Sequence, residues 1–142
     1  MKVILDTNIF VSALKSNKGA SYALISQLPS DMFQIALSIP LYVEYQDVLT
    51  RPEHMTGVSK VEDILAFLRY ICSIAHKQQI FFLWRPWLND PKDDMVLEVA
   101  VASQSRYIIT YNLKDFKGVK EHFGITPVTP GEFLKIMRNE KS

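Results

Sequence analysis

The chain lacks the features that mark secreted and membrane-spanning proteins. Its 142 residues include a single cysteine, Cys72, so no disulfide can form within the chain. The first residues show no basic segment leading into an apolar run and a small-residue cleavage site. The longest apolar stretches fall far below the roughly 20 residues that a membrane helix requires. We therefore expect a cytoplasmic protein that has no membrane partner.

Excess charge of one sign and the common phosphate-binding loops are also missing. The formal net charge is +1, so any nucleic acid must be held by local patches or through metal ions. No glycine-rich loop of the GxxxxGK[ST] or GxGxxG kind occurs, which disfavours nucleotide-binding enzymes. His54, His76 and His122 do not have the spacing of zinc ligands.

Apolar residues are abundant, and their pattern indicates an α/β fold. They make up 48% of the chain, enough for the core of one domain over residues 1–142. Short, continuous apolar runs are typical of buried parallel strands. We expect such strands at residues 2–5, 34–38, 79–83, 106–110 and, less clearly, 125–128.

Helical spacing of apolar residues separates these runs. The clearest helix runs from Ser59, a plausible cap, to His76, and Thr129 with Glu132 forms a capping box for a final helix. Strands that alternate with helices predict a three-layer α/β/α sandwich with a central parallel sheet of four or five strands. We expect the other helices near residues 9–14, 20–28, 40–49, 94–103 and 119–123.

Four acids follow successive strands of this predicted sheet. Asp6 ends the first strand, and Glu44 lies in the helix after the second. Asp94 opens the helix after the third strand, and Asp115 follows the fourth. In an open parallel sheet, ligands bind outside the carboxyl ends of the strands. We therefore expect these carboxylates to converge on one site.

Carboxylates gathered without balancing cations raise one another's pKa unless a metal ion neutralises them. With oxygen ligands and no cluster of cysteine and histidine, Mg²⁺ or Mn²⁺ is favoured over zinc. Such a site can activate water and neutralise a phosphodiester, so no protein nucleophile is needed. The pattern predicts a metal-dependent phosphodiester hydrolase.

Two of the acids have a structural alternative in their own neighbourhood. Asp6 can serve as a helix cap, although Thr7 and Asn8 are able to do the same. Glu44 competes with Asp47, because an acid on a solvated helix face is common. We favour Asp6 as functional and leave Glu44 and Asp47 open on the residues alone.

The other two acids also have alternatives. Asp93 and Asp94 begin a helix, where the helix dipole favours any acid, so one of them is expected to be structural. We favour Asp94 as the ligand, because it falls at the amino end of the buried helix face. Asp115 fits a turn residue near Lys114 and Gly118 equally well.

Taken together, these motifs resemble a PIN domain over essentially the whole chain. The resemblance is closest to the toxin components of bacterial toxin–antitoxin pairs. It is carried by an apolar strand followed by Asp6-Thr7-Asn8-Ile9-Phe10, by Glu44-Tyr45 and Leu49-Thr50-Arg51-Pro52, by Asp90-Pro91-Lys92-Asp93-Asp94, and by Ile108-Ile109-Thr110-Tyr111-Asn112-Leu113-Lys114-Asp115-Phe116.

The resemblance implies a ribonuclease that cleaves RNA, with an antitoxin protein as partner and a homodimer as assembly. Asp6, Glu44 and Asp94 would hold Mg²⁺ or Mn²⁺, while three further residues, Thr110, Asn112 and Asp115, would complete the site. Many members have aspartate where this chain has Asn112, which bears on whether one or two metals bind. The helix from 59 to 76 is a candidate for the dimer interface or for the core.

Residues around the acids have weaker predicted roles. Thr7, Asn8 and Asp93 are expected to support the site. Lysines after the first and fourth strands are candidates for contact with the phosphate backbone: Lys15, Lys18, Lys114, Lys117 and Lys120. Four aromatic residues, Trp84, Trp87, Tyr107 and Tyr111, are more often core than base-stacking residues.

Two other functions compete with the ribonuclease. A catalytically weak or inactive PIN-like module that binds nucleic acid or protein is the stronger rival, and Asn112 is its direct support. A phosphatase with an aspartyl nucleophile is the more distant one, because it requires a second aspartate at the position of Asn8.

Overall fold

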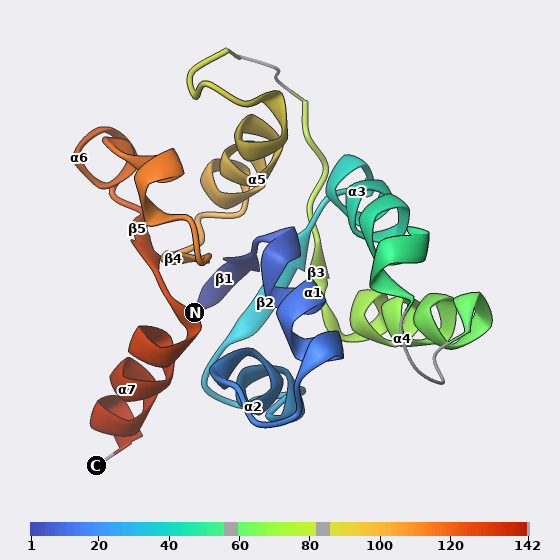
Figure 1. The fold of residues 1–142 in the computed structure, drawn as a ribbon. Coiled ribbons are helices and arrows are strands. Elements are labelled where there is room, and N and C mark those ends of the chain that lie inside the picture. Colours follow the sequence, from blue (N-terminus) through green and yellow to red (C-terminus); the bar gives the residue numbers. More distant parts are fainter. Residues whose placement is uncertain (56–59, 82–85, 142) are drawn as a thin grey trace.

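The computed structural model describes residues 1–55, 60–81 and 86–141, and its five strands form one parallel sheet (Figure 1). The strand order is β3-β2-β1-β4-β5, so the first and fourth strands of the chain lie side by side in the centre. The strands are β1 (Lys2–Leu5), β2 (Gln34–Leu37), β3 (His76–Lys77), β4 (Tyr107–Ile109) and β5 (Thr126–Val128).

Helices connect all the strands, as parallel pairing requires. The α-helices are α1 (Thr7–Lys15), α2 (Ala20–Ser26), α3 (Ile39–Leu49), α4 (Val61–Ile74), α5 (Pro91–Ala102), α6 (Val119–Phe123) and α7 (Pro130–Lys141). Two 3₁₀ helices, η1 (Pro52–His54) and η2 (Leu113–Phe116), complete the described elements.

The connections place helices on both faces of the sheet. The crossovers from β1 to β2 and from β2 to β3 run in one direction across the sheet, whereas the crossover from β3 to β4 runs back. Right-handed connections therefore put α5 on the face opposite to α1–α4. Consistently, α1 contacts α2 and α3, while α5 packs against β1, β2 and β4. The predicted three-layer sandwich is confirmed.

The two central strands fix the position of the site. Val3, Ile4 and Leu5 are buried, because helices cover β1 on both sides. Leu5 pairs with Ile109, so β1 and β4 end at the same level. The N–H of Asp6 then donates to the Ile109 carbonyl oxygen at 2.9 Å. The residues that follow these strands are thus held side by side.

The third strand differs from its prediction. We expected it at 79–83, but β3 comprises His76–Lys77 and pairs with the end of β2. Helix α4 ends at Ile74 and Ala75 is already extended, so the strand begins earlier than the apolar run. An edge strand has only one neighbour and is often short. The described residues 78–81 are not part of a strand, and residues 82 and 83 lie outside the described chain.

The observed helix caps agree in part with those predicted from the sequence. Asp6 caps α1, instead of Thr7 or Asn8, and its carboxylate accepts the Thr7 N–H at 2.8 Å. Thr129 and Glu132 form the predicted capping box before α7, with reciprocal bonds of 3.1 and 3.2 Å. The expected cap Ser59 and the aromatic Trp84 lie outside the described residues. No helix in the described part of the chain is long and apolar enough to cross a membrane.

Candidate active site

Asp6 is the carboxylate that the fold holds most firmly. Its Oδ1 accepts the Thr7 N–H at 2.8 Å, and its Oδ2 accepts the hydroxyl of Thr110 at 2.7 Å. Burial raises the pKa of Asp6, the two hydrogen bonds lower it, and the charges of Asp115 and Asp90 raise it further. Asp6 is thus anchored beside other acids whose charges oppose its ionisation.

Thr110 links Asp6 to the segment after β4. The side chain is fully buried, and its Oγ1 also accepts the Asn112 N–H at 3.0 Å. One hydroxyl therefore fixes the carboxylate of Asp6 and the backbone that leads to Asp115. The supporting role of Thr110 in a functional site stays a prediction.

Tyr45 positions α3 against the end of β1. Its buried hydroxyl donates to the carbonyl oxygen of Leu5, and its ring packs edge-on against Phe10 at 4.8 Å between centroids. Burial raises the pKa of Tyr45 well above its usual value, and the charge of Asp6 adds to the shift. The helix that carries Glu44 is thereby tied to the strand that precedes Asp6.

Glu44 and Asp47 differ in their surroundings. The side chain of Glu44 is 15% exposed, and its Oε1 lies 3.5 Å from Nζ of Lys92 at the start of α5. Asp47 is 63% exposed and pairs with Arg51 one turn later on the same helix, at 2.9 Å. Glu44 therefore faces α5, whereas Asp47 belongs to a solvated ion pair. The geometry favours Glu44 of the two.

Asp94 is buried and satisfied by backbone donors. It is 1% exposed, as its place on the buried face of α5 predicts. Its Oδ1 accepts the Leu88 N–H at 2.8 Å and the Trp87 N–H at 3.3 Å, and its Oδ2 is 3.4 Å from the Trp87 nitrogen. These bonds give Asp94 an evident structural task, namely holding the segment before α5.

Asp93 is the acid of α5 that interacts most with the other carboxylates. Its pKa is raised to about 7, first by burial and then by the charges of Asp6, Asp90, Asp115 and Asp94. Asp94 is the last contributor to this shift and does not contribute to that of Asp6. We expected Asp93 only as a supporting residue. The spacing of residues in the sequence cannot show which of the two carboxylates will accept hydrogen bonds from nearby backbone N–H groups.

Asp115 lies on η2 and Asn112 directly precedes this short helix, at the exposed rim of the site. The Asp115 N–H donates to the Asn112 carbonyl oxygen at 3.0 Å, which closes the turn. Both side chains are exposed, yet the charge of Asp115 raises the pKa of Asp6 and of Asp93. Asp115 therefore serves the turn and also adds charge to the carboxylate group.

Tyr111 ties the segment after β4 to α1 and α2. Its hydroxyl bonds to Ser21 at 2.6 Å and lies 3.5 Å from the Ser12 hydroxyl, so it connects α1 and α2. Its N–H points to Oδ1 of Asn8 at 3.5 Å, a long contact. Sequence reasoning did not find this link, because the partners stand about 100 residues apart. Tyr107 is buried against Phe133 in the core.

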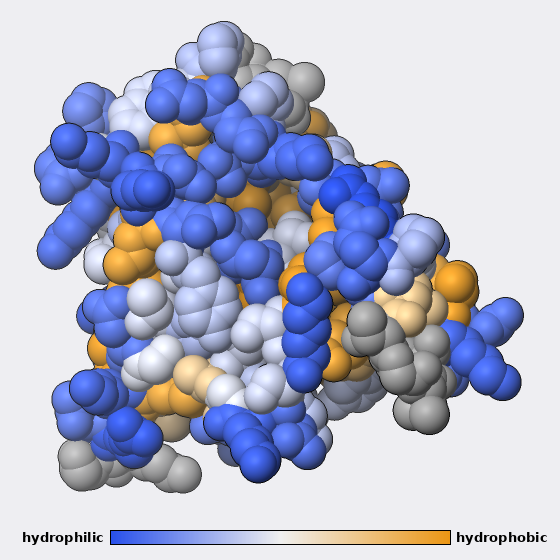
Figure 2. Space-filling view, in the orientation of Figure 1, coloured by the Kyte–Doolittle hydropathy of each residue, from blue (hydrophilic) through white to orange (hydrophobic). Residues whose placement is uncertain are grey.

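The predicted lysines fall into two groups. Lys15 and Lys18 are exposed at the end of α1 that is distant from Asp6, about 13 Å away along the helix axis. Lys114 and Lys117 are exposed around η2 and flank Asp115. Figure 2 shows hydrophilic side chains at the upper left of the view, over the region where α6 lies in Figure 1. Only the second group lies next to the acids.

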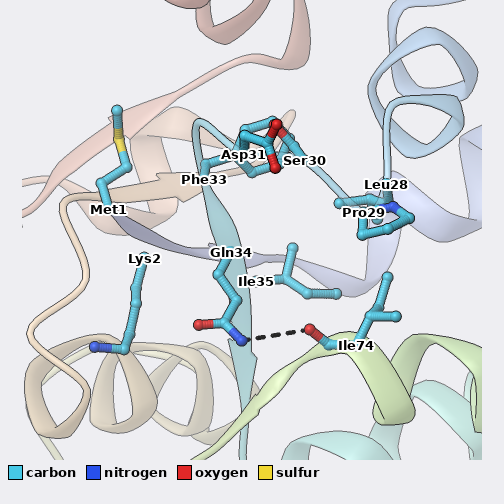
Figure 3. Close-up of a pocket in the computed structure, with 10 residues that line it drawn as sticks. All are labelled: Met1, Lys2, Leu28, Pro29, Ser30, Asp31, Phe33, Gln34, Ile35 and Ile74. Carbon is cyan, nitrogen blue, oxygen red and sulfur yellow. Dashed lines mark hydrogen bonds between the residues drawn. The ribbon is translucent and has the colours of Figure 1, made fainter.

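The acids do not line either of two described cavities. One, of about 450 Å³, lies at the amino ends of the strands, where Gln34 donates to the carbonyl of Ile74 at 3.4 Å (Figure 3). The other, of about 980 Å³, runs beside β3 and is lined by residues of α3, α4 and α5. The carboxylate group is instead an open cluster at the opposite end from the first cavity.

A hard divalent cation suits the donor set of this cluster. In residues 1–55, 60–81 and 86–141, no three side chains of His, Cys, Asp or Glu stand close enough to hold one ion together. Mg²⁺ commonly keeps several waters and uses only one or two carboxylates. The raised pKa of Asp6 and of Asp93 indicates carboxylates that such a cation would stabilise.

Comparison with known proteins agrees with this fold. The sequence model of the PIN domain matches residues 2–114, so the chain belongs to the PIN domain family. The fold is similar to the 2.2 Å structure of VapBC-1 from nontypeable Haemophilus influenzae, with a TM-score of 0.59 and 15% identity over 92% of this chain and 99% of that one.

A second solved structure gives the same result. VapBC2 from Rickettsia felis, bound to a DNA fragment from its promoter, matches with a TM-score of 0.58 and 17% identity, over 91% of this chain and 98% of that one. No curated protein sequence matches this chain. The solved structures therefore support the fold, and the family model supports the family.

Proposed function

We propose that this chain is a Mg²⁺- or Mn²⁺-dependent endoribonuclease that hydrolyses RNA phosphodiester bonds and is the toxin of a toxin–antitoxin pair. The observation that carries the proposal is the group of carboxylates at the carboxyl ends of β1 and β4, with Asp6 and Asp93 both shifted toward protonation. A group of this kind in a PIN domain is best explained by cation binding.

Asp6, Glu44, Asp94 and Asp115 are the proposed ligands, and Asp93 joins them because of its interaction with Asp6 and Asp115. One or two of these carboxylates at a time would bind the ion, and water would fill its other positions. The bound cation would neutralise the phosphate and lower the pKa of the attacking water. Thr110 holds Asp6 in place for this role, and Tyr45 anchors the helix of Glu44. Glu44 is a ligand or accepts the proton of the water.

The substrate phosphates are proposed to contact lysines at the rim. Lys114 and Lys117 stand beside Asp115, so they are the better placed pair. Lys15 and Lys18 would meet only a more distant part of the strand. Replacing these lysines with neutral residues should weaken RNA binding and reduce its dependence on salt concentration, without altering metal binding.

A protein partner is part of the proposal. Both similar structures are VapBC complexes, which supports a cognate antitoxin for this chain. The groove beside β3 is bordered by Ile39 and Phe81, which are 80% and 86% exposed. Exposed apolar side chains at a groove support an interface with protein, and we propose a homodimer there. Light scattering of the purified chain tests this assembly.

The alternative function is a catalytically weak or inactive PIN-like module that binds nucleic acid or protein. Asn112 favours it, because the amide replaces a carboxylate at the rim of the site. Such a module would bind RNA without cleaving it. The distinction is therefore one of turnover, which binding measurements alone do not report.

Cleavage of single-stranded RNA by purified protein at increasing Mn²⁺ tests the proposal. Wild type should cleave only with the metal, and Asp6→Asn should lose at least about 100-fold in rate, since it removes an anionic ligand without changing volume. Asp47→Asn is the matched control, because Asp47 is held in a surface ion pair with Arg51. Cleavage that persists in Asp6→Asn would mark a contaminating nuclease, and binding without cleavage by wild type would favour the inactive module.

A further inference from the structure

The side chain of Lys92 contacts Glu44, although the sequence did not single out this lysine. It is the second residue of α5, and its Nζ lies 3.5 Å from Oε1 of Glu44 on α3. Its backbone N–H donates to Oδ1 of Asp90 at 2.9 Å. An ion pair thus connects α3 and α5 within the candidate site.

The location is locally unfavourable for a lysine. The first turn of a helix is the positive end of its dipole, which repels cations and attracts acids such as Asp93 and Asp94. The ammonium group of Lys92 extends from this turn to the carboxylate of another helix. Attraction to Glu44 therefore accounts for the position of Lys92.

The two partners are unequally buried. The side chain of Glu44 is 15% exposed, whereas that of Lys92 is 55% exposed. A carboxylate removed from water depends on a counter-ion, while an ammonium on a flexible four-carbon stem can return to solvent. The Asp47–Arg51 pair is different, because both of its side chains are well exposed. Lys92 is therefore the exchangeable partner of Glu44.

We propose that Lys92 is the counter-ion of Glu44 in the metal-free protein and that a divalent cation competes with it for this carboxylate. The inference rests on the proposed function, because it takes Glu44 as a metal ligand. Lys92 is a positioning residue: it keeps Glu44 oriented when the site lacks metal and leaves when the cation binds. It thereby sets the divalent concentration above which Glu44 becomes a ligand.

Thermal unfolding measured across a Mn²⁺ titration tests this competition without any RNA. Lys92→Met should lower the half-saturating Mn²⁺ concentration about threefold, the fold-change expected from loss of a partly exposed ion pair. Lys114→Met is the matched control, because it also removes one positive charge next to an acid of the site. It should change the midpoint less. Lys92→Gln provides a second replacement if Met at this position perturbs folding.

A double-mutant cycle assigns the effect to Glu44. In a Glu44→Gln background, Lys92→Met should alter the Mn²⁺ midpoint no more than Lys114→Met does. Equal effects of Lys92→Met with and without Glu44 would overturn the inference, as would equal effects of the two lysine replacements. Wild type that shows no Mn²⁺-dependent stabilisation would refute the proposed metal site itself, and the competition with it. A normal wild-type response that Lys92→Met leaves unchanged refutes only the role of Lys92.

Discussion

The amino ends of α1 and α5 both present carboxylates at the carboxyl edge of the sheet, but their charges are balanced differently. At α1, Asp6 receives one backbone N–H and one buried hydroxyl. At α5, Asp94 takes the backbone donors, while Asp93 is surrounded by other acids. One acid of α5 therefore stabilises the fold, whereas the ionised form of its neighbour opposes it.

The largest effect on stability is expected at Asp94. Asp94→Ala leaves the buried N–H of Leu88 without its acceptor and weakens the Trp87 contact. We expect a loss of about 2–3 kcal/mol in the free energy of unfolding, measured by urea denaturation in EDTA. Asp94→Asn keeps one acceptor oxygen and should cost less. A loss below about 0.5 kcal/mol for Asp94→Ala would show that these bonds do not support the fold.

The second largest loss of stability is expected for Thr110→Val. The change keeps the shape of the side chain, but it removes the donor to Asp6 and the acceptor of the Asn112 N–H. We expect a loss of about 1–2 kcal/mol and a further rise in the pKa of Asp6. Thr110→Ser, which retains the hydroxyl, is the control. Equal losses in both variants would assign the effect to packing.

Asp93→Asn should stabilise the metal-free protein, whereas the two preceding replacements destabilise it. The pKa of Asp93 is about 7 in the folded protein, against an ordinary value of 3.8, so the folded state holds its proton over this range while the unfolded chain releases it. Stability of the metal-free protein should therefore fall as pH rises from 4 to 7. Asp93→Asn should reduce this decline, to which Asp6 also contributes, and should stabilise the protein above pH 7 by about 1 kcal/mol, after allowance for solvent screening.

Thermal unfolding in EDTA between pH 4 and pH 8 measures this difference. Asp47→Asn serves as the control, since it also replaces one carboxylate, in an exposed ion pair with Arg51. Wild type that becomes more stable between pH 5 and pH 7, with Asp93→Asn following the same curve, would contradict the contrast between Asp93 and Asp94.

The smallest effect is expected at Asn112. Asn112→Asp adds a like charge at the exposed rim and should destabilise the metal-free protein by a few tenths of a kcal/mol. It should also lower the Mn²⁺ concentration for half-maximal RNA cleavage, because carboxylate is a harder ligand than amide. Titration of cleavage and of melting temperature with Mn²⁺ measures both. A variant that needs more Mn²⁺ would place residue 112 outside the cation site.

The fold could be predicted further than the site. The buried parallel strands β1 and β4 could be predicted because they are continuous apolar runs. The prediction of the edge strand β3 was wrong because a strand of two residues gives no such pattern. The place of the acids after the carboxyl ends of the strands could be predicted from the order of strands and helices alone. The division of tasks between Asp93 and Asp94 did not, because it depends on where the loop of Leu88 places its N–H groups.

Lys92 and Tyr111 escaped prediction for a related reason. Each acts through a contact with a residue from a distant part of the chain, Glu44 for the first and Ser21 for the second. Local spacing indicates which face of a helix a residue occupies. It does not indicate which side chain of another helix will meet it, so such links require the three-dimensional structure.

The hydrogen bond between Thr110 and Asp6 joins residues 104 positions apart. During synthesis the amino-terminal half of the chain, with Asp6 and Glu44, leaves the ribosome well before Thr110 and Asp115 exist. The N–H of Thr110 in turn donates to Val128 in β5, which is made later still. A nascent or truncated chain that ends before β4 therefore lacks Asp115 and the Thr110 hydroxyl that holds Oδ2 of Asp6. The hydrogen bonds around Asp6 are therefore complete only after β4 and β5 have been made.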